Sequence, residues 1–405
     1  MPHAVFWAQK KQGTDQLFPK KIGAQTHFPL HTDWLVAHPN RKRGTDRGVC
    51  MPVLLSVGTA RMPYTAAQDE VKQHVAGLFA GRMARAERLL QAFDNSGIHT
   101  RTFVQPLAWY SVPHGFGEKN GVYIDRAVRY SGEAVNDCLC KASSSHVLHE
   151  EIDALFYIST TGLSTPSIEA RLMNVLPFSP HAVRVPIWGL GCAGGAAGLA
   201  RAADYCRAFP NAKALVIAVE FCSLTFQLND WSKSNVIGTS LFSDGVACVL
   251  VAGDGAASAN GAPRVIAARS VLMPGSEDVM GWDVCDEGLF VVFSKDIPMI
   301  VRTWLRPQVE SFLQEHGLGL GDLHYFIAHP GGRKVIEAYE EAFGFGPEQT
   351  KAARDVLARY GNMSSATVYF VLEQMMRQPL SPGHGLLIAL GPGFSAEMVL
   401  LQWEG

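Results

Sequence analysis

The stretch WGLGCAGGAAGLARAADYCRAF, residues 188–209, decides how the rest of the chain is interpreted. A glycine-rich turn holds one cysteine, Cys192, and runs into small and apolar residues that predict a helix over 196–209. Backbone N–H groups at a helix start favour a thiolate over a thiol, and glycines leave room for a substrate carbonyl. The turn therefore predicts a nucleophilic cysteine; the alternative is a cysteine that fills space in the core.

Outward from this turn, strand and helix patterns alternate, which is typical of an α/β fold. Apolar runs predict strands at 53–57, 154–159, 214–219, 245–251 and 398–403, and a long helix is predicted over 68–93. A second turn with Asn362 precedes a helix-like segment, 364–376, much as Cys192 precedes its own helix. We interpret this as a duplicated α/β unit that places Cys192 and Asn362 at equivalent helix starts facing one cleft.

Composition narrows the class of protein. The 405 residues are 47% hydrophobic and 18% charged, which indicates a globular chain with a large core. The net charge of −2 gives no sign of a nucleic-acid partner. No apolar run approaches the ~20 residues of a transmembrane helix, and no signal peptide is recognisable. The eight cysteines are scattered without a CxxC pair, so unpaired thiols in the cytoplasm and no metal site are expected.

The chain divides into three parts by composition. Residues 1–50 carry a cluster of Lys and Arg without periodicity and are predicted to be a poorly structured extension; an ordered arm or dimer strap is the alternative. Residues 51–254 form the first α/β half. A small-residue linker at 255–263 opens the second half, 255–405.

Two further motifs carry chemistry. FIAHPGG, residues 326–332, is a strand that ends in His329, and YGNMSSA, residues 360–366, contains Asn362. Alone, His329 could be an ordinary histidine at a strand end, and Asn362 could cap a helix. With Cys192 before them, and Gly391-Pro392-Gly393 after them, the chain from residue 51 onward resembles the chalcone synthase-like type III polyketide synthases, which are thiolase-fold condensing enzymes.

The resemblance implies a fold, substrates and an assembly. The fold is thiolase-like: two duplicated βαβαβαββ halves forming a five-layer αβαβα core. The substrates are acyl-CoA and malonyl-CoA, no other cofactor is needed, and the enzyme is a homodimeric acyltransferase. Cys192 would hold the acyl group as a thioester, while His329 and Asn362 would donate hydrogen bonds to the thioester oxygen during decarboxylation of malonyl-CoA. His329 would also keep Cys192 ionised.

Other positions are carried over from the family one at a time. Phe242, in LFSDG, matches a gatekeeper phenylalanine, although an ordinary core aromatic is the alternative. Val291 stands where plant enzymes have a second gatekeeper phenylalanine, and Thr165 stands where a methionine reaches into the partner's cavity, so both suggest a roomier cavity. The remaining positions expected to line it are Thr225, Gly391, Pro392 and Gly393.

The phosphates of CoA are assigned to the predicted helix over 68–93. Arg82 and Arg85 lie three residues apart there and share one side of the helix. The family places basic residues on this helix at the mouth of the CoA tunnel. A solvated helix face is the alternative.

The sequence resembles bacterial members that make alkylpyrones or alkylresorcinols from long-chain fatty acyl-CoA starters. A type III polyketide synthase with another starter and a ketoacyl synthase III-like enzyme are the alternatives, although the latter usually has different histidine and asparagine motifs. A catalytically inactive acyl-binding scaffold and a papain-like cysteine hydrolase are the remaining ones.

Overall fold

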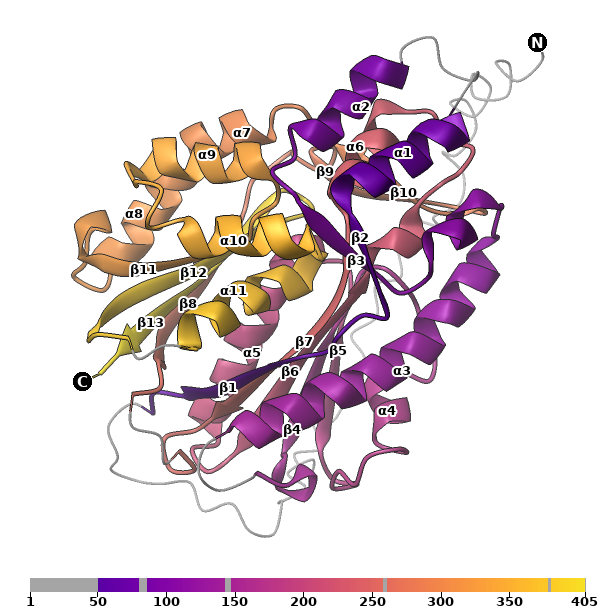
Figure 1. The fold of residues 1–405 in the computed structure, drawn as a ribbon. Coiled ribbons are helices and arrows are strands. Elements are labelled where there is room, and N and C mark those ends of the chain that lie inside the picture. Colours follow the sequence, from indigo (N-terminus) through magenta and orange to yellow (C-terminus); the bar gives the residue numbers. More distant parts are fainter. Residues whose placement is uncertain (1–49, 80–85, 143–146, 258–260, 378–379, 405) are drawn as a thin grey trace, which may run out of the picture. The chain divides into compact units, whose positions relative to one another are not determined.

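The computed structural model describes residues 50–79, 86–142, 147–257, 261–377 and 380–404. The predicted N-terminal extension lies outside these ranges, except for residue 50. Within the described residues the principal sheet has nine strands, in the order β11-β12-β13-β8-β1-β7-β6-β4-β5 (Figure 1). Its strands are β1 (Val53–Thr59), β4 (Ala154–Ile158), β5 (Val183–Ile187), β6 (Lys213–Phe221), β7 (Asp244–Ala252), β8 (Arg264–Leu272), β11 (Leu323–Ala328), β12 (Gly383–Gly391) and β13 (Ser395–Trp403).

The strand order shows that the fold is duplicated. From the centre outward, β1-β7-β6-β4 in one half corresponds to β8-β13-β12-β11 in the other. In both series the first three strands pair antiparallel, and the fourth pairs parallel with the third. The halves meet where β1 pairs with β8 at Val53 and Arg264. The α/β fold and the internal duplication predicted from the sequence are therefore confirmed.

Helices cover both faces of each half. The main helices are α1 (Gln68–Phe79), α2 (Ala86–Asp94), α3 (Phe116–Lys141), α4 (Ile168–Leu172), α5 (Gly194–Ala208), α6 (Lys233–Leu241), α7 (Ile297–Ile300), α8 (Arg306–Gln314), α9 (Arg333–Phe343), α10 (Lys351–Tyr360) and α11 (Thr367–Met376). The single helix predicted over 68–93 corresponds to α1 and α2; residues 80–85 lie outside the described ranges. The described residues also form two small sheets, β2 (Tyr64–Ala67) with β3 (Thr100–Phe103) and β9 (Met280–Cys285) with β10 (Gly288–Phe293).

Side-chain alternation along the strands builds five layers. In β6, Leu215 and Ile217 pack in a core with α3, whereas Val216 packs in a central core with α5 and α11. In β12, Leu387 joins the same central core, whereas Leu386 packs with α8 and α9. The layers are therefore α3, the first half of the sheet, α5 with α11, the second half, and α8 with α9, as predicted.

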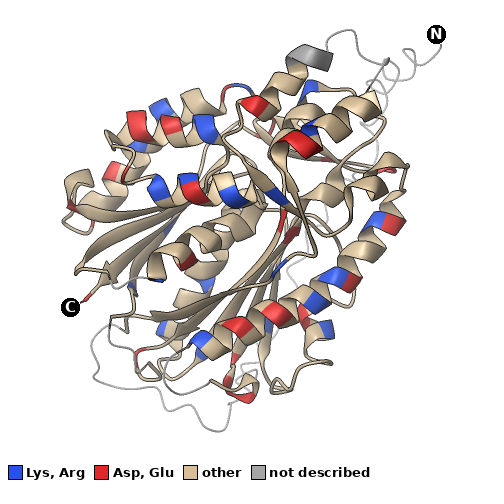
Figure 2. Cartoon of the chain, in the orientation of Figure 1, with Lys and Arg blue, Asp and Glu red and all other residues tan. Residues whose placement is uncertain are grey.

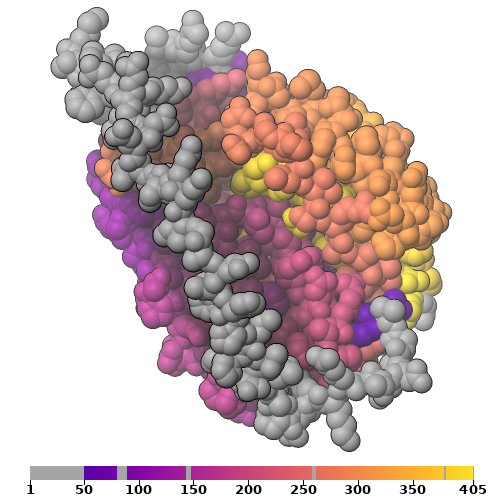
Figure 3. Space-filling view, turned by 180° about the vertical axis from the view of Figure 1, so that it is seen from behind, coloured from indigo at the N-terminus to yellow at the C-terminus, as the bar shows by residue number. Residues whose placement is uncertain are grey.

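The surface is consistent with this layering. Charged residues lie mostly on helices such as α3, whose outer side alternates acidic and basic residues, while most strand residues are uncharged (Figure 2). Seen from behind, the first half and the second half lie side by side (Figure 3). No helix in the described part combines the length and the hydrophobicity needed to cross a bilayer.

Candidate active site

The three chemistry-bearing residues come from three separate chain segments and line one cavity. Cys192 lies in a 3₁₀ turn, Gly191–Ala193, directly before α5. His329 follows the last residue of β11, and Asn362 lies between α10 and a second 3₁₀ turn, Ser364–Ala366. The cavity that all three line has a volume of about 570 Å³. The structure thus brings together the residues that the sequence singled out.

The Cys192 turn is tight because glycine permits it. Gly189 and Gly191 have φ of 93° and 48°, a region that favours glycine. A Cβ on Gly191 would come within 2.7 Å of Cδ of Pro392, so the Gly-Pro-Gly segment packs directly against the cysteine turn. Cys192 is partly exposed as a residue, whereas its thiol lies in a desolvated environment at the start of α5.

Asn362 is held by its own backbone and side chain. Its N–H donates to the carbonyl of Leu241 at 2.9 Å, and its carbonyl accepts from the N–H of Ser243 at 2.8 Å. The N–H of Ser364, which has a φ of 48°, donates to Oδ1 of Asn362 at 2.8 Å. Nδ2 donates to the carbonyl of Gly331 at 3.2 Å. Because Oδ1 is occupied, the amide presents its N–H donors, not its acceptor, to the HPGG turn.

His329 is buried and its ring is uncommitted. Its backbone N–H donates to the carbonyl of Ile388 at 2.8 Å, which fixes the residue at the end of β11. Only 2% of the residue is exposed, and neither ring nitrogen has a hydrogen-bond partner among the described residues. Burial lowers the pKa of His329 to about 3, so the ring is neutral at physiological pH.

The protonation state of Cys192 differs from the one expected from the sequence. Burial raises the pKa of the Cys192 thiol to about 12, although hydrogen bonds from the side chains of Ser364 and Asn362 oppose this shift. The negative charge of Glu220 raises the pKa further. Desolvation of the thiolate outweighs the favourable helix start, so the site without substrate holds a neutral thiol and a neutral imidazole.

Glu220 is a buried residue that the sequence analysis missed. It lies in β6 with no exposed surface. Its carboxyl group accepts four hydrogen bonds: from the N–H and Oγ1 of Thr160 at 3.0 and 2.9 Å, from Oγ1 of Thr161 at 2.9 Å, and from Oγ of Ser365 at 2.5 Å. Burial raises its pKa. The only signal in the sequence was one acidic residue at the end of an apolar strand.

The outer part of the cavity is basic. It is lined by four cationic residues that the sequence analysis did not select: Lys233, Lys295, Arg333 and Lys334. They come from the start of α6, the segment after β10 and the start of α9. The predicted CoA residues Arg82 and Arg85 lie outside the described residues.

The predicted cavity positions do not form the wall of this space. None of the seven is among the residues that line the 570 Å³ cavity. The ring of Phe242 lies 5.6 Å from that of Phe293, which does line it. Val291 packs against Gly238. Thr225 is buried, and its hydroxyl donates to the carbonyl of Cys222. Thr165 is exposed on the single chain. The last three positions are Gly391, Pro392 and Gly393, of which the first two contact the cysteine turn.

Comparison with known proteins gives the family. The model of the chalcone and stilbene synthase N-terminal domain matches residues 120–255, and that of the C-terminal domain matches residues 264–403. A Bacillus subtilis (strain 168) protein named for chalcone synthase is 48% identical, over 87% of this chain and 99% of its own. The Mycobacterium tuberculosis (strain ATCC 25618 / H37Rv) "Alpha-pyrone synthesis polyketide synthase-like Pks18" is 31% identical over 86% of this chain and 90% of its own.

A solved structure agrees with these sequence matches. The crystal structure of 1,3,6,8-tetrahydroxynaphthalene synthase from Streptomyces coelicolor A3(2), a bacterial type III polyketide synthase, superimposes with a TM-score of 0.80 at 29% identity. The match covers 87% of this chain and 99% of that one. The chain belongs to the chalcone and stilbene synthase family and has its thiolase-like fold.

Proposed function

We propose that this member of the chalcone and stilbene synthase family condenses a long-chain fatty acyl-CoA starter with malonyl-CoA and cyclises the product to alkylpyrones or alkylresorcinols. The observation that carries the proposal is the single cavity lined by Cys192, His329 and Asn362, with basic residues at its outer part. Similarity to Pks18, whose name refers to α-pyrone synthesis, supports this product class.

The first step is acyl transfer to Cys192. The imidazole of His329 accepts the proton of the thiol as sulfur attacks the thioester carbonyl of the starter. The C–S bond to CoA breaks, the proton passes to the departing CoA sulfur, and the starter remains as a thioester on Cys192. Since the pKa shifts of both groups favour the neutral pair, the thiolate forms only as the reaction proceeds.

The second step is decarboxylative condensation. Loss of carbon dioxide from malonyl-CoA leaves an enolate, whose charge gathers on the thioester oxygen. Nδ2 of Asn362 and the ring N–H of His329 donate to that oxygen. The enolate carbon then attacks the acyl carbonyl, its bond to Cys192 breaks, and a chain longer by two carbons remains on CoA.

The cavity wall fits both parts of such substrates. Lys233, Lys295, Arg333 and Lys334 suit the phosphates of CoA. Other residues of the wall are apolar, among them Ile237, Met280, Phe293 and Leu390. Burial of each methylene contributes ~0.8 kcal/mol, about fourfold in selectivity, so an apolar wall favours a long starter.

We also propose a homodimer. Strand β5 lies at one edge of the principal sheet, and Val183 and Trp188 are 40% and 48% exposed on the single chain. An open strand edge with exposed apolar residues suits pairing with a second copy. Light scattering of the wild type and of Trp188→Glu tests this, and a wild-type monomer would contradict it.

The functional test is a mass-spectrometric product profile with malonyl-CoA and a series of acyl-CoA starters. We expect palmitoyl-CoA to be turned over much faster than benzoyl-CoA, and Ile237→Phe, at a residue that lines the cavity, to shift the preference toward shorter chains. Release of 1,3,6,8-tetrahydroxynaphthalene would instead favour the second candidate, the activity for which the structural neighbour is named. Dependence on an acyl carrier protein would indicate a ketoacyl synthase III-like enzyme.

A further inference from the structure

Arg101 is a large, fully buried side chain outside the catalytic cavity. It lies in β3 and is 1% exposed. Its Nη1 donates to two main-chain carbonyls, that of Thr239 and, at 2.8 Å, that of Phe242. Both carbonyls belong to the last turn and C-cap of α6, where a cation also complements the helix dipole.

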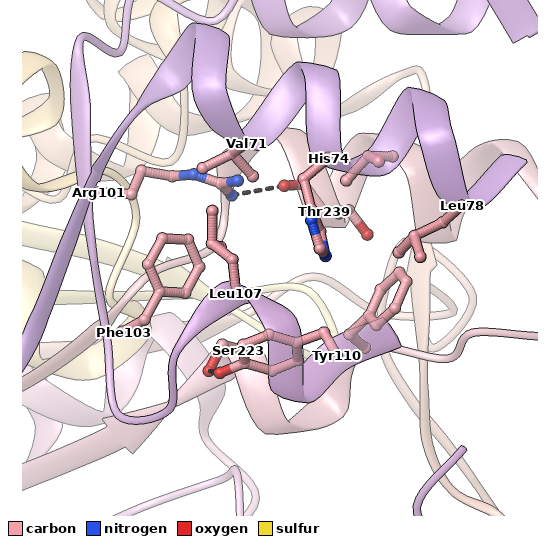
Figure 4. A pocket seen from close by; sticks show the side chains of 11 residues that line it. Val71, His74, Leu78, Arg101, Phe103, Leu107, Tyr110, Ser223 and Thr239 are labelled. Carbon is pink, nitrogen blue, oxygen red and sulfur yellow. Dashed lines mark hydrogen bonds between the residues drawn. The ribbon is translucent and has the colours of Figure 1, made fainter. Parts of the chain in front are cut away.

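The rest of the guanidinium group is held by aromatic rings and faces a small pocket. Its central carbon lies 5.2 Å from the ring centre of Phe103 and 5.9 Å from that of Phe93. Figure 4 shows the group between Val71 and Leu107, at one end of a pocket of about 40 Å³. Nε and Nη2 have no hydrogen-bond partner among the described residues. Burial lowers the pKa of Arg101 to about 9, so the group is still charged at neutral pH.

The end of α6 that Arg101 holds is also the segment that holds Asn362. Asn362 donates to the carbonyl of Leu241 and accepts from the N–H of Ser243, the residues on either side of Phe242. Phe242 and Asn362 form a parallel β-bridge. Arg101 also packs directly against Gly361, the residue before Asn362, because a Cβ added to Gly361 would lie 3.1 Å from Cγ of Arg101.

We propose that Arg101 is a positioning residue: it fixes the C-terminal end of α6, and through it the amide of Asn362, for decarboxylation of malonyl-CoA. This rests on the proposed function. The contacts run from Arg101 to the carbonyl of Phe242, and from the residues beside Phe242 to both backbone groups of Asn362. The thiol of Cys192 meets this chain of contacts through its hydrogen bond with the side chain of Asn362, but attack of the sulfur on the starter depends on His329 and not on that bond. Loss of Arg101 therefore affects the decarboxylation step and spares acyl loading.

The test separates these two steps in Arg101→Met, with Arg207→Met as the matched control. Arg207 also donates to two main-chain carbonyls, those of Val265 and Ile266, at 2.9 and 3.0 Å, but these carbonyls belong to β8 and not to the end of α6. Release of carbon dioxide from malonyl-CoA and the mass shift of Cys192 with acyl-CoA are measured for each. We expect Arg101→Met to lose about 100-fold in kcat for decarboxylation, because a donor misplaced by an ångström costs that much, with KM and acyl loading unchanged. Arg207→Met should keep wild-type rates.

Three results would overturn the assignment: wild-type decarboxylation in Arg101→Met, equal losses of loading and decarboxylation, or the same selective loss in Arg207→Met. If Arg101→Met is not recovered folded, Arg101→Lys is measured in the same way. The lysine keeps a buried positive charge but replaces the planar guanidinium group, with its several fixed N–H donors, by a compact ammonium group. A selective loss of decarboxylation supports the proposal and wild-type behaviour overturns it. A wild-type enzyme that neither loads acyl groups nor releases carbon dioxide would reject the proposed function itself.

Discussion

The cysteine turn and the asparagine turn occupy equivalent places in the two halves, yet they are built differently. Cys192 lies within a 3₁₀ turn and Asn362 lies two residues before one, and each of these turns leads into a helix at the centre of the molecule, α5 or α11. Cys192 is half-buried, with glycines on both sides, whereas Asn362 is 2% exposed and both its backbone groups and its amide are hydrogen-bonded. One half thus presents a side chain that must accept and release an acyl group, and the other presents a fixed donor.

The difference shows how a duplicated fold can separate two chemical tasks. A nucleophile needs space around it, because its bonding partners change during turnover. A group that stabilises developing charge works best when its orientation is set beforehand. The comparison therefore predicts that substitutions in the two turns impair different steps.

The largest effect is expected for Cys192→Ala. Without the sulfur no thioester can form, so acyl loading and all products should be lost, while malonyl-CoA decarboxylation should persist. Intact-protein mass spectrometry after incubation with acyl-CoA measures the loading. Cys140→Ala, at an exposed cysteine, is the control and should load normally. Acylation of Cys192→Ala at the wild-type level would remove the distinction between the two turns.

The reciprocal effect is expected for Asn362→Ala and His329→Ala. Each removes a donor to the thioester oxygen, which costs ~3 kcal/mol, a 10²–10³-fold loss in malonyl-CoA decarboxylation. Acyl loading should survive in Asn362→Ala. Asn95→Ala is the matched control, since that amide also lines the cavity but bonds to the carbonyl of Gln91. Near-normal release of carbon dioxide from both variants would contradict the roles given to them.

Much of this comparison could be predicted from the sequence. What could not be predicted has physical causes. The order of the cysteine, HPGG and GNMSS motifs predicted that three side chains would meet, and the structure brings them to one cavity. Glu220 and Arg101 gave no comparable signal, because an isolated charge in an apolar segment becomes informative only when its neighbours are known. The ionised Cys192 was expected from a local feature, the helix start, but the pKa depends on desolvation by the whole fold.

A smaller effect concerns the pH dependence of Cys192 alkylation by iodoacetamide in the absence of substrate. The thiolate is the reactive form, and burial raises the pKa to about 12, so the rate should be low at pH 7 and rise about tenfold per pH unit to at least pH 10. His329 titrates at about 3 and should add no step above pH 5. Peptide mapping distinguishes Cys192 from the exposed Cys140 and Cys285. If the alkylation rate instead reached a plateau near neutral pH, Cys192 would be a thiolate paired with an imidazolium. The cysteine turn would then be organised before substrate binds, as the asparagine turn is.

The smallest effect is expected where the two turns touch. A Cβ on Gly195, in α5, would lie 2.4 Å from the carbonyl oxygen of Ser365, next to α11. The overlap is with backbone, so Gly195→Ala must push the turns apart, which we expect to lower the free energy of unfolding by about 1–3 kcal/mol. Gly121→Ala, in α3 with no atom within 4 Å of its Cβ, should instead raise it by about 0.5–1 kcal/mol. Denaturant unfolding of both variants measures the difference, and equal stabilities would mean that the contact between the turns does not constrain them.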